Sequence, residues 1–275
     1  MSTLAWVSLA VATIFLCAVM TGAWITQRIT GNAGWSDAFW SFGMGGAGVF
    51  LALVPLEGAD FPTLRQFVIA ALVGFWSLRL AAHIAERSFK GKEDARYAQF
   101  REEWGAAFER KLFLFLMMQA LSGALLLGSV LLAAQNPSPT LRAQDFLAVA
   151  VLIAAIVGEG LADRQLRAFK ADPANKDGVC DVGLWGWSRH PNYFFEWMGW
   201  LAYPIFAIEL TGGYWGGLLA LTGPAFMYWL LVHVSGIPPL EAHMMRSRPE
   251  AFARTKARVS AFFPRPPTSS KSTSR

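Results

Sequence analysis

Long apolar stretches separated by short polar islands dominate the chain. Each stretch is about 20 residues long, the length at which an α-helix crosses the hydrocarbon core of a bilayer. The first stretch differs from a signal peptide because no basic residue precedes it and its apolar run is too long. The pattern predicts an all-α, polytopic membrane helix bundle with seven transmembrane helices, at residues 4–26, 34–56, 62–86, 111–134, 143–163, 192–210 and 213–235.

Composition and charge set the orientation of this bundle. The chain is 54% hydrophobic and 16% charged, unlike ordinary soluble proteins. Almost all of the 24 Lys and Arg follow the first, third, fifth and seventh spans, and only Arg65 and Arg142 fall on the other side. Basic loops stay in the cytoplasm, so we expect the N-terminus outside and the C-terminus cytoplasmic. The protein is therefore predicted to be a multi-pass integral membrane protein, of the inner membrane in a bacterium, with its active site facing the cytoplasm.

The remaining features of the chain add few further elements. Residues 1–265 are predicted to form a single domain, and residues 266–275 have the composition of a disordered tail. Residues 88–110 read as an amphipathic cytoplasmic helix whose role is left open. The net charge of +5 follows from topology and does not indicate nucleic acid. Cys17 and Cys180 indicate neither a disulfide nor a metal site.

The stretch "WGWSRHPNYFFEW" places polar side chains where the sixth span begins. Pro191 suits the first position of a helix, whose free backbone amides attract anions. With Arg189 and His190 beside them, these amides predict a phosphate or pyrophosphate site. Asn192 and Glu196 lie four residues apart and share one helix face. Alternatively the two cations mark the membrane interface and Asn192 caps the helix, but this leaves Glu196 unexplained.

The fifth span also carries polar residues near its cytoplasmic end. Glu159 and Asp163, at the end of the fifth span, could accept hydrogen bonds from ribose hydroxyls, with Lys170 available for a phosphate. The alternative is an ordinary ion pair between Asp163 and Arg167. Ionisable groups are costly in lipid and are functional candidates by default.

The third span ends with three basic residues on one stripe. Arg79, His83 and Arg87 recur every four residues, and snorkelling explains Arg87 most easily. Arg79 needs an anionic partner, either an acidic side chain or a ligand phosphate. Glu241 and His243 follow the last span on the same side, where a lone His is usually solvated. Together these groups suit an anionic nucleotide that binds within the cytoplasmic end of the helix bundle. The sequence has no GxGxxG motif after a strand, so a Rossmann-type site is not expected.

The same residues carry a family resemblance. "EGLADRQLRAFK", "GLWGWSRHPNYFFEWMGW" and "SGIPPLEAHMMRSRPEAF" resemble the C-terminal half of membrane steroid 5α-reductases and their bacterial relatives, over residues 150–265. The resemblance implies NADPH-dependent reduction of the conjugated C=C of a lipophilic enone, typically a 3-oxo-Δ4-steroid, to the 5α-dihydro product. The predicted cofactor-binding residues are Arg79, Arg87, Glu159, Asp163, Leu166, Lys170, Arg189, His190, Asn192, Tyr193, Glu196, Glu241 and His243.

The catalytic donor is less well defined by the resemblance. The reductases carry a Glu on the second span and a Tyr on the third that bind the substrate ketone. Here the second span offers only Asp37, which also suits a first-turn position, and the third span has no Tyr. The predicted catalytic residues are therefore Asp37, if a desolvated setting keeps it protonated, and His83.

Two other functions stay open. A membrane methyltransferase that uses S-adenosylmethionine, of the isoprenylcysteine or phospholipid type, shares an Arg-His-Pro core. Those enzymes favour a Glu-Glu pair after the last span, where this chain has Glu241 followed by Ala and His. A transporter or lipid-binding receptor would favour symmetric halves, which the sequence does not show. The predicted partners are a lipophilic small molecule entering from the bilayer and membrane lipids, with no nucleic acid, for a monomer.

Overall fold

The computed structural model describes residues 2–90 and 95–268, without the side chains of residues 87 and 95. Over these residues the chain is helical and has no β-strand; an isolated parallel bridge joins Ser188 and Ser260. The prediction of an all-α chain is confirmed. The chain forms two compact units, Met1–Val149 with Ala202–Gly223 and Ala150–Leu201 with Pro224–Arg275.

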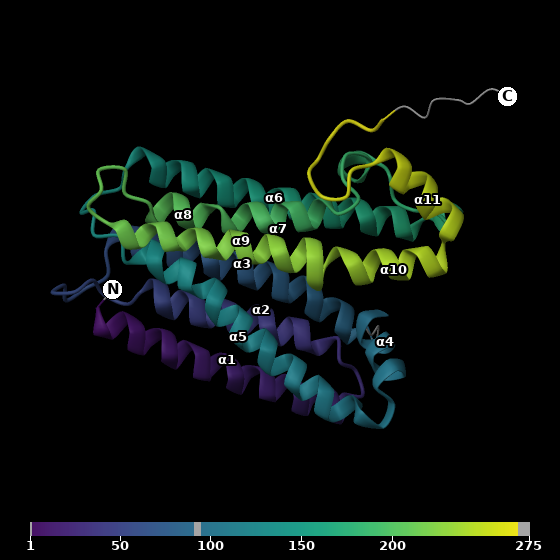
Figure 1. Cartoon of the computed structure of the whole chain (residues 1–275), viewed down its shortest axis with the longest axis horizontal. Helices are drawn as coiled ribbons and strands as arrows, with labels where there is room; N and C mark the ends of the chain where they lie inside the picture. Colours follow the sequence, from purple (N-terminus) through teal and green to yellow (C-terminus); the bar gives the residue numbers. More distant parts are fainter. Residues whose placement is uncertain (1, 91–94, 269–275) are drawn as a thin grey trace. The chain divides into compact units, whose positions relative to one another are not determined.

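The first unit is built from four long helices that lie alongside one another (Figure 1). Helix α2 packs against α1 and α3, and α5 packs against α1 and α2. A short helix, α4, precedes α5. Their bounds are α1 Thr3–Thr30, α2 Trp35–Ala52, α3 Leu64–Phe89, α4 Ala95–Trp104 and α5 Phe108–Ala134.

Small residues let α2 and α3 approach closely. A Cβ added to Gly45 would lie 2.0 Å from Oγ of Ser77, and one added to Gly48 would lie 2.9 Å from the Val73 side chain. The Ser77 hydroxyl donates to the carbonyl of Ser41 across the same contact, at 2.7 Å. Helices in lipid associate mainly through close packing and such hydrogen bonds, which explains the glycine-rich stretch of α2.

A buried polar network secures the beginning of α3 in the first unit. Arg65 pairs with Asp145 at 2.9 Å, and their side chains are only 2% and 1% exposed. Arg65 also donates to the carbonyls of Ser138 and Thr140, at 2.7 and 2.6 Å. Arg142 adds a second cation, 2.8 Å from Asp145. Since buried charges are costly unless paired, this network is a structural tie between the loops and helix ends that carry it.

The second unit contains the carboxyl-terminal part of α6 and four shorter helices. A Cβ added to Gly158 of α6 would lie 2.4 Å from the Phe195 ring of α7, so these helices cross there. The Trp197 indole of α7 donates to the carbonyl of Pro224 at 3.1 Å, which ties α7 to α9. The bounds are α6 Ala143–Ala171, α7 Pro191–Trp200, α9 Thr222–Trp229, α10 Ile237–Ser247 and α11 Pro249–Arg258.

Fewer of the described helices are suited to crossing a membrane than the seven spans that the sequence predicts. Five described helical segments are long and apolar enough to cross: Thr3–Thr30, Leu64–Glu86, Arg96–Ala134, Ala143–Ala171 and Trp215–Ser247. A multi-pass membrane protein is therefore supported, while seven spans and the orientation stay predictions.

Two of the predicted spans have a different form. The span predicted at 34–56 is the 18-residue α2. The span predicted at 192–210 is divided into α7 and α8, Ala202–Ala207, because Pro204 has no N–H to continue the helical ladder.

The cytoplasmic segment and the tail are described in part. Of the amphipathic helix predicted at 88–110, residues 95–104 form α4, and residues 91–94 lie outside the described residues. Most of the tail predicted at 266–275 also lies outside them.

Candidate functional site

The amino end of α7 in the second unit is held by the C-terminal segment. Pro191 occupies the first turn, as predicted. The N–H of Arg189 donates to the carbonyl of Ser260 at 2.8 Å, and the Ser188 hydroxyl donates to that of Phe262 at 2.8 Å. The segment that follows α11 therefore pairs with the residues that lead into α7 and fixes where this helix begins.

Arg189 is committed to contacts within the protein. Its side chain is 8% exposed, and Nε and Nη2 donate to Oε1 of Glu241 at 2.9 and 2.7 Å. Nη1 donates to the carbonyls of Val259 and Lys256. The sequence predicts a phosphate contact for Arg189, and in this structure its guanidinium binds Glu241 and two backbone carbonyls. A buried guanidinium is costly unless it is paired. The spacing of residues in the sequence does not show which groups pair with Arg189.

His190 shares the same carboxylate. Its Nε2 lies 3.2 Å from Oε1 of Glu241, and its ring stacks on Tyr193 with centroids 5.6 Å apart. The residue is 3% exposed, and Nδ1 is buried without a hydrogen-bond partner in the described part of the chain. Burial lowers the pKa of His190 from its ordinary 6.5, against the opposing effect of Glu241. The ring is therefore neutral at neutral pH.

The predicted polar face of α7 is only partly satisfied by the protein. The Trp200 indole donates to Oε1 of Glu196 at 3.0 Å. Asn192 is half-buried, and its amide has no hydrogen-bond partner among the described residues. Buried polar groups are normally paired, so Nδ1 of His190 fits a polar ligand at this helix end, beside the half-buried Asn192.

The predicted residues of α6 lie along one side of that helix. Glu159 is buried, Asp163 and Leu166 are half-buried, and Lys170 is exposed. Glu159 is adjacent to Gly158, where α6 crosses α7, and Glu196 is adjacent to Phe195 at the same crossing. Glu159 and Glu196 are thus each one residue away from the contact between Gly158 and Phe195. His243 of α10 is half-buried.

In the first unit, Asp37 belongs to a different cluster from the one predicted. Its Oδ2 pairs with Nη2 of Arg96 at 2.7 Å, and its Oδ1 accepts from the Tyr97 hydroxyl at 2.8 Å. Tyr97 is fully buried, and the Arg96 guanidinium lies over its ring, 4.8 Å from the centroid. A carboxylate that accepts from a guanidinium and a phenol acts as an acceptor. The sequence predicts a protonated Asp37 as the donor, whereas in this geometry the Asp37 side chain is in contact with two donors.

The other predicted residues of the first unit lie on α3. Arg79 and His83 are half-buried and four residues apart on that helix. The side chain of Arg87 lies outside the described part of the structure. The prediction for these three residues therefore stays a prediction.

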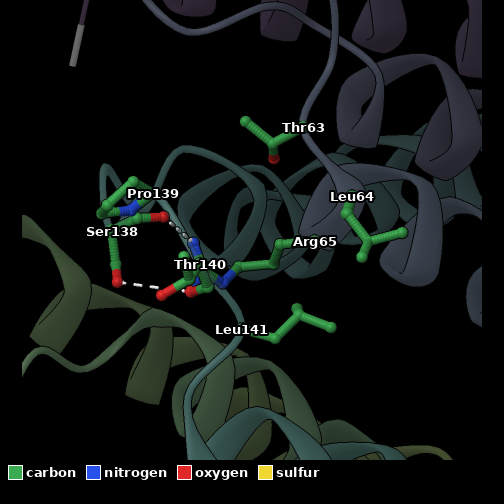
Figure 2. Close-up of a pocket in the computed structure, with 7 residues that line it drawn as sticks. All are labelled: Thr63, Leu64, Arg65, Ser138, Pro139, Thr140 and Leu141. Carbon is green, nitrogen blue, oxygen red and sulfur yellow. Dashed lines mark hydrogen bonds between the residues drawn. The ribbon is translucent and has the colours of Figure 1, made fainter.

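A small pocket in the first unit lies elsewhere. Figure 2 shows its lining, in which Arg65 reaches toward the backbone of Ser138 and Thr140. Its volume is about 240 Å³. From Arg65 to Arg79 is fourteen residues, about 21 Å of helix, so this pocket is remote from the predicted residues of α3. All the donors of Arg65 are used in the network described above, so its guanidinium is not available to a ligand in this pocket.

Comparison with known proteins places the chain in a family. A family model described as a protein of unknown function, DUF1295, matches residues 23–259, most of the chain. The chain belongs to this family. No curated protein and no solved structure matches it.

Within this family member, Tyr97 and Arg96 are the functional candidates that sequence reasoning missed. The resemblance implies a Tyr on the third span, whereas Tyr97 lies on α4, within the segment predicted to be an amphipathic cytoplasmic helix. The signal was present in "DARY", which follows the third span in the part of the chain that resembles the reductases more weakly. Only the fold shows that its phenol meets Asp37, sixty residues earlier.

Proposed function

We propose that the protein reduces the conjugated C=C of a lipophilic enone, such as a 3-oxo-Δ4-steroid, with NADPH as the hydride donor. The observation that carries this proposal is the contact between the buried Tyr97 and the half-buried Asp37, with 2.8 Å between hydroxyl and carboxylate. It supplies an acid and a phenol of the kind that the resemblance implies for binding a substrate ketone.

The residues of the second unit fit a nucleotide. Nδ1 of His190 and the amide of Asn192 lack partners within the described chain. Carboxylates at Glu159, Asp163 and Glu196 can accept from hydroxyl groups, and Lys170 is exposed for a phosphate. When bound, NADPH would supply the hydride that reduces the β-carbon of the enone.

The chain's own contribution to the reaction is a hydrogen-bond donor. As hydride reaches the β-carbon, negative charge develops on the carbonyl oxygen, and a donor placed there stabilises the enolate. In this proposal the Tyr97 hydroxyl turns from Asp37 to the carbonyl oxygen. Arg96 continues to pair with Asp37 and lies over the Tyr97 ring, which favours developing charge on the phenol. Protonation of the α-carbon of the enolate by a proton from solvent would complete the saturated ketone.

The test is oxidation of NADPH by the detergent-purified protein in the presence of progesterone. We expect oxidation that depends on the steroid and yields the 5α-dihydro product, and no calorimetric binding of S-adenosylmethionine. Binding of S-adenosylmethionine without binding of NADPH would replace this proposal with the methyltransferase function. Binding of NADPH without turnover of any enone would retain the cofactor and remove the substrate class.

A further inference from the structure

The imidazole of His190 is half satisfied. Nε2 lies 3.2 Å from Oε1 of Glu241, whereas Nδ1 is buried and has no hydrogen-bond partner in the described part of the chain. The residue as a whole is 3% exposed. Because nearly all buried polar atoms in folded proteins are paired, Nδ1 points to a partner that the chain itself does not provide.

The surrounding charges assign the proton on this ring. Oε1 of Glu241 also accepts from Nε and Nη2 of Arg189, and Lys256 lies 3.5 Å from Oε2. A carboxylate surrounded in this way only accepts hydrogen bonds, so Nε2 of His190 must carry the hydrogen and donate it. Burial lowers the pKa of His190 against the opposing effect of Glu241, and the adjacent Arg189 acts in the same direction as burial. The ring is therefore neutral, and its other nitrogen carries a lone pair.

We propose that Nδ1 of His190 accepts a hydrogen bond from an uncharged donor of the bound nucleotide, a ribose hydroxyl or the carboxamide, and does not contact a phosphate. This inference rests on the proposed function and assigns one part of its ligand. The oxygens of an ionised phosphate only accept hydrogen bonds, so a phosphate at Nδ1 would require the ring to take up a proton. Arg189, whose guanidinium already binds Glu241 and two backbone carbonyls, adds little to the attraction for a phosphate.

Proton linkage separates the two arrangements in the intact protein. NADPH is titrated into the wild-type protein at neutral pH by calorimetry, in buffers of different ionisation enthalpy. We expect the same binding heat in every buffer, because no proton is taken up. Heats that scale with the buffer's ionisation enthalpy, with proton uptake on binding, would overturn this inference while leaving the proposed function in place.

The tautomer can be observed without any ligand. In protein labelled with ¹⁵N at its four histidines, the His190 signals are assigned by their loss in the His190→Gln variant. We expect Nε2 protonated and Nδ1 bare in the ligand-free protein. A hydrogen on Nδ1 of the ligand-free protein would overturn the inference.

Two substitutions separate the two nitrogens. His190→Gln keeps a donor near the position of Nε2, for Glu241, but has no acceptor near that of Nδ1; His190→Asn does the reverse. A net hydrogen bond corresponds to about 2–10-fold in affinity, so we expect NADPH to bind His190→Gln weaker by that factor. We expect His190→Asn to bind NADPH more tightly than His190→Gln does.

The outcomes distinguish the inference from the function it rests on. Equal affinity of the wild type and a folded His190→Gln variant contradicts the inference alone. If the wild-type protein binds no NADPH, the proposed function fails and the inference fails with it. If His190→Gln does not fold, the buffer series on the wild-type protein still decides, because it needs no variant.

Discussion

Replacing Glu241 by Gln should destabilise the second unit strongly. Gln has nearly the shape of Glu but no charge, so it would leave Arg189, whose side chain is 8% exposed, without its counter-charge. Breaking a buried ion pair by neutralising one partner costs about 3–5 kcal/mol. In a chain of this size, a loss of 1 kcal/mol in the free energy of unfolding lowers Tm by roughly 2–4 °C. We therefore expect the Tm of Glu241→Gln to be lower by roughly 10 °C.

The assay is the apparent Tm of the detergent-purified protein, at one scan rate because membrane proteins often unfold irreversibly. Lys256→Gln is the matched control, since Lys256 meets the same carboxylate but is 53% exposed and 3.5 Å away. An exposed pair contributes about 0–1 kcal/mol, so this variant should change Tm little. Equal shifts for Glu241→Gln and Lys256→Gln would refute the assignment of a buried, structural ion pair.

Three further outcomes can be measured in the same way. Gly158→Ala would put a methyl group 2.4 Å from an aromatic ring of α7 and should lower stability by about 1–3 kcal/mol. Gly160→Ala is the control, because a methyl group there meets open space and should be neutral or stabilising. Equal effects of the two substitutions would contradict the close contact of α6 and α7. Asp145→Asn should cost about 3–5 kcal/mol, because its pair with Arg65 is buried, and an unchanged Tm would show that the network is dispensable. Burial lowers the pKa of His190 below 6.5 in the folded protein. As pH drops, the unfolded chain therefore binds a proton at His190 before the folded protein does, and the stability should fall below pH 6.5. A His190→Gln variant should lose that part of the pH dependence, and identical pH profiles of the variant and the wild type would contradict this prediction.

Helices set by a local pattern could be predicted from the sequence. The apolar runs that form α1, α3, α5 and α6 are long and uninterrupted, so hydropathy alone located them. The division at Leu201 was harder to predict, because Pro204 interrupts a run whose apolar composition is continuous. Hydropathy measures how well a segment dissolves in lipid and not whether its hydrogen-bond ladder is intact.

The candidate site was predictable only where its residues lie close in sequence. Asn192 and Glu196 share a face because helix geometry fixes a spacing of four. The partners of Arg189 and Asp37 come from residues 52 and 60 positions away, so no local pattern gives them. For this reason the sequence alone does not reveal that Arg189 is held by Glu241, or that Asp37 accepts a hydrogen bond from Tyr97.

The most direct measurement of the central claim compares Tyr97→Phe with the wild type in a single turnover of NADPH with a 3-oxo-Δ4-steroid. Removing a donor to a developing oxyanion costs about 10²–10³ in rate, and in this proposal the Tyr97 hydroxyl binds the substrate carbonyl and not the nucleotide. We therefore predict a loss of that size in the rate of hydride transfer with nearly unchanged NADPH affinity. A Tyr97→Phe variant that reduces the steroid at the wild-type rate would contradict the account.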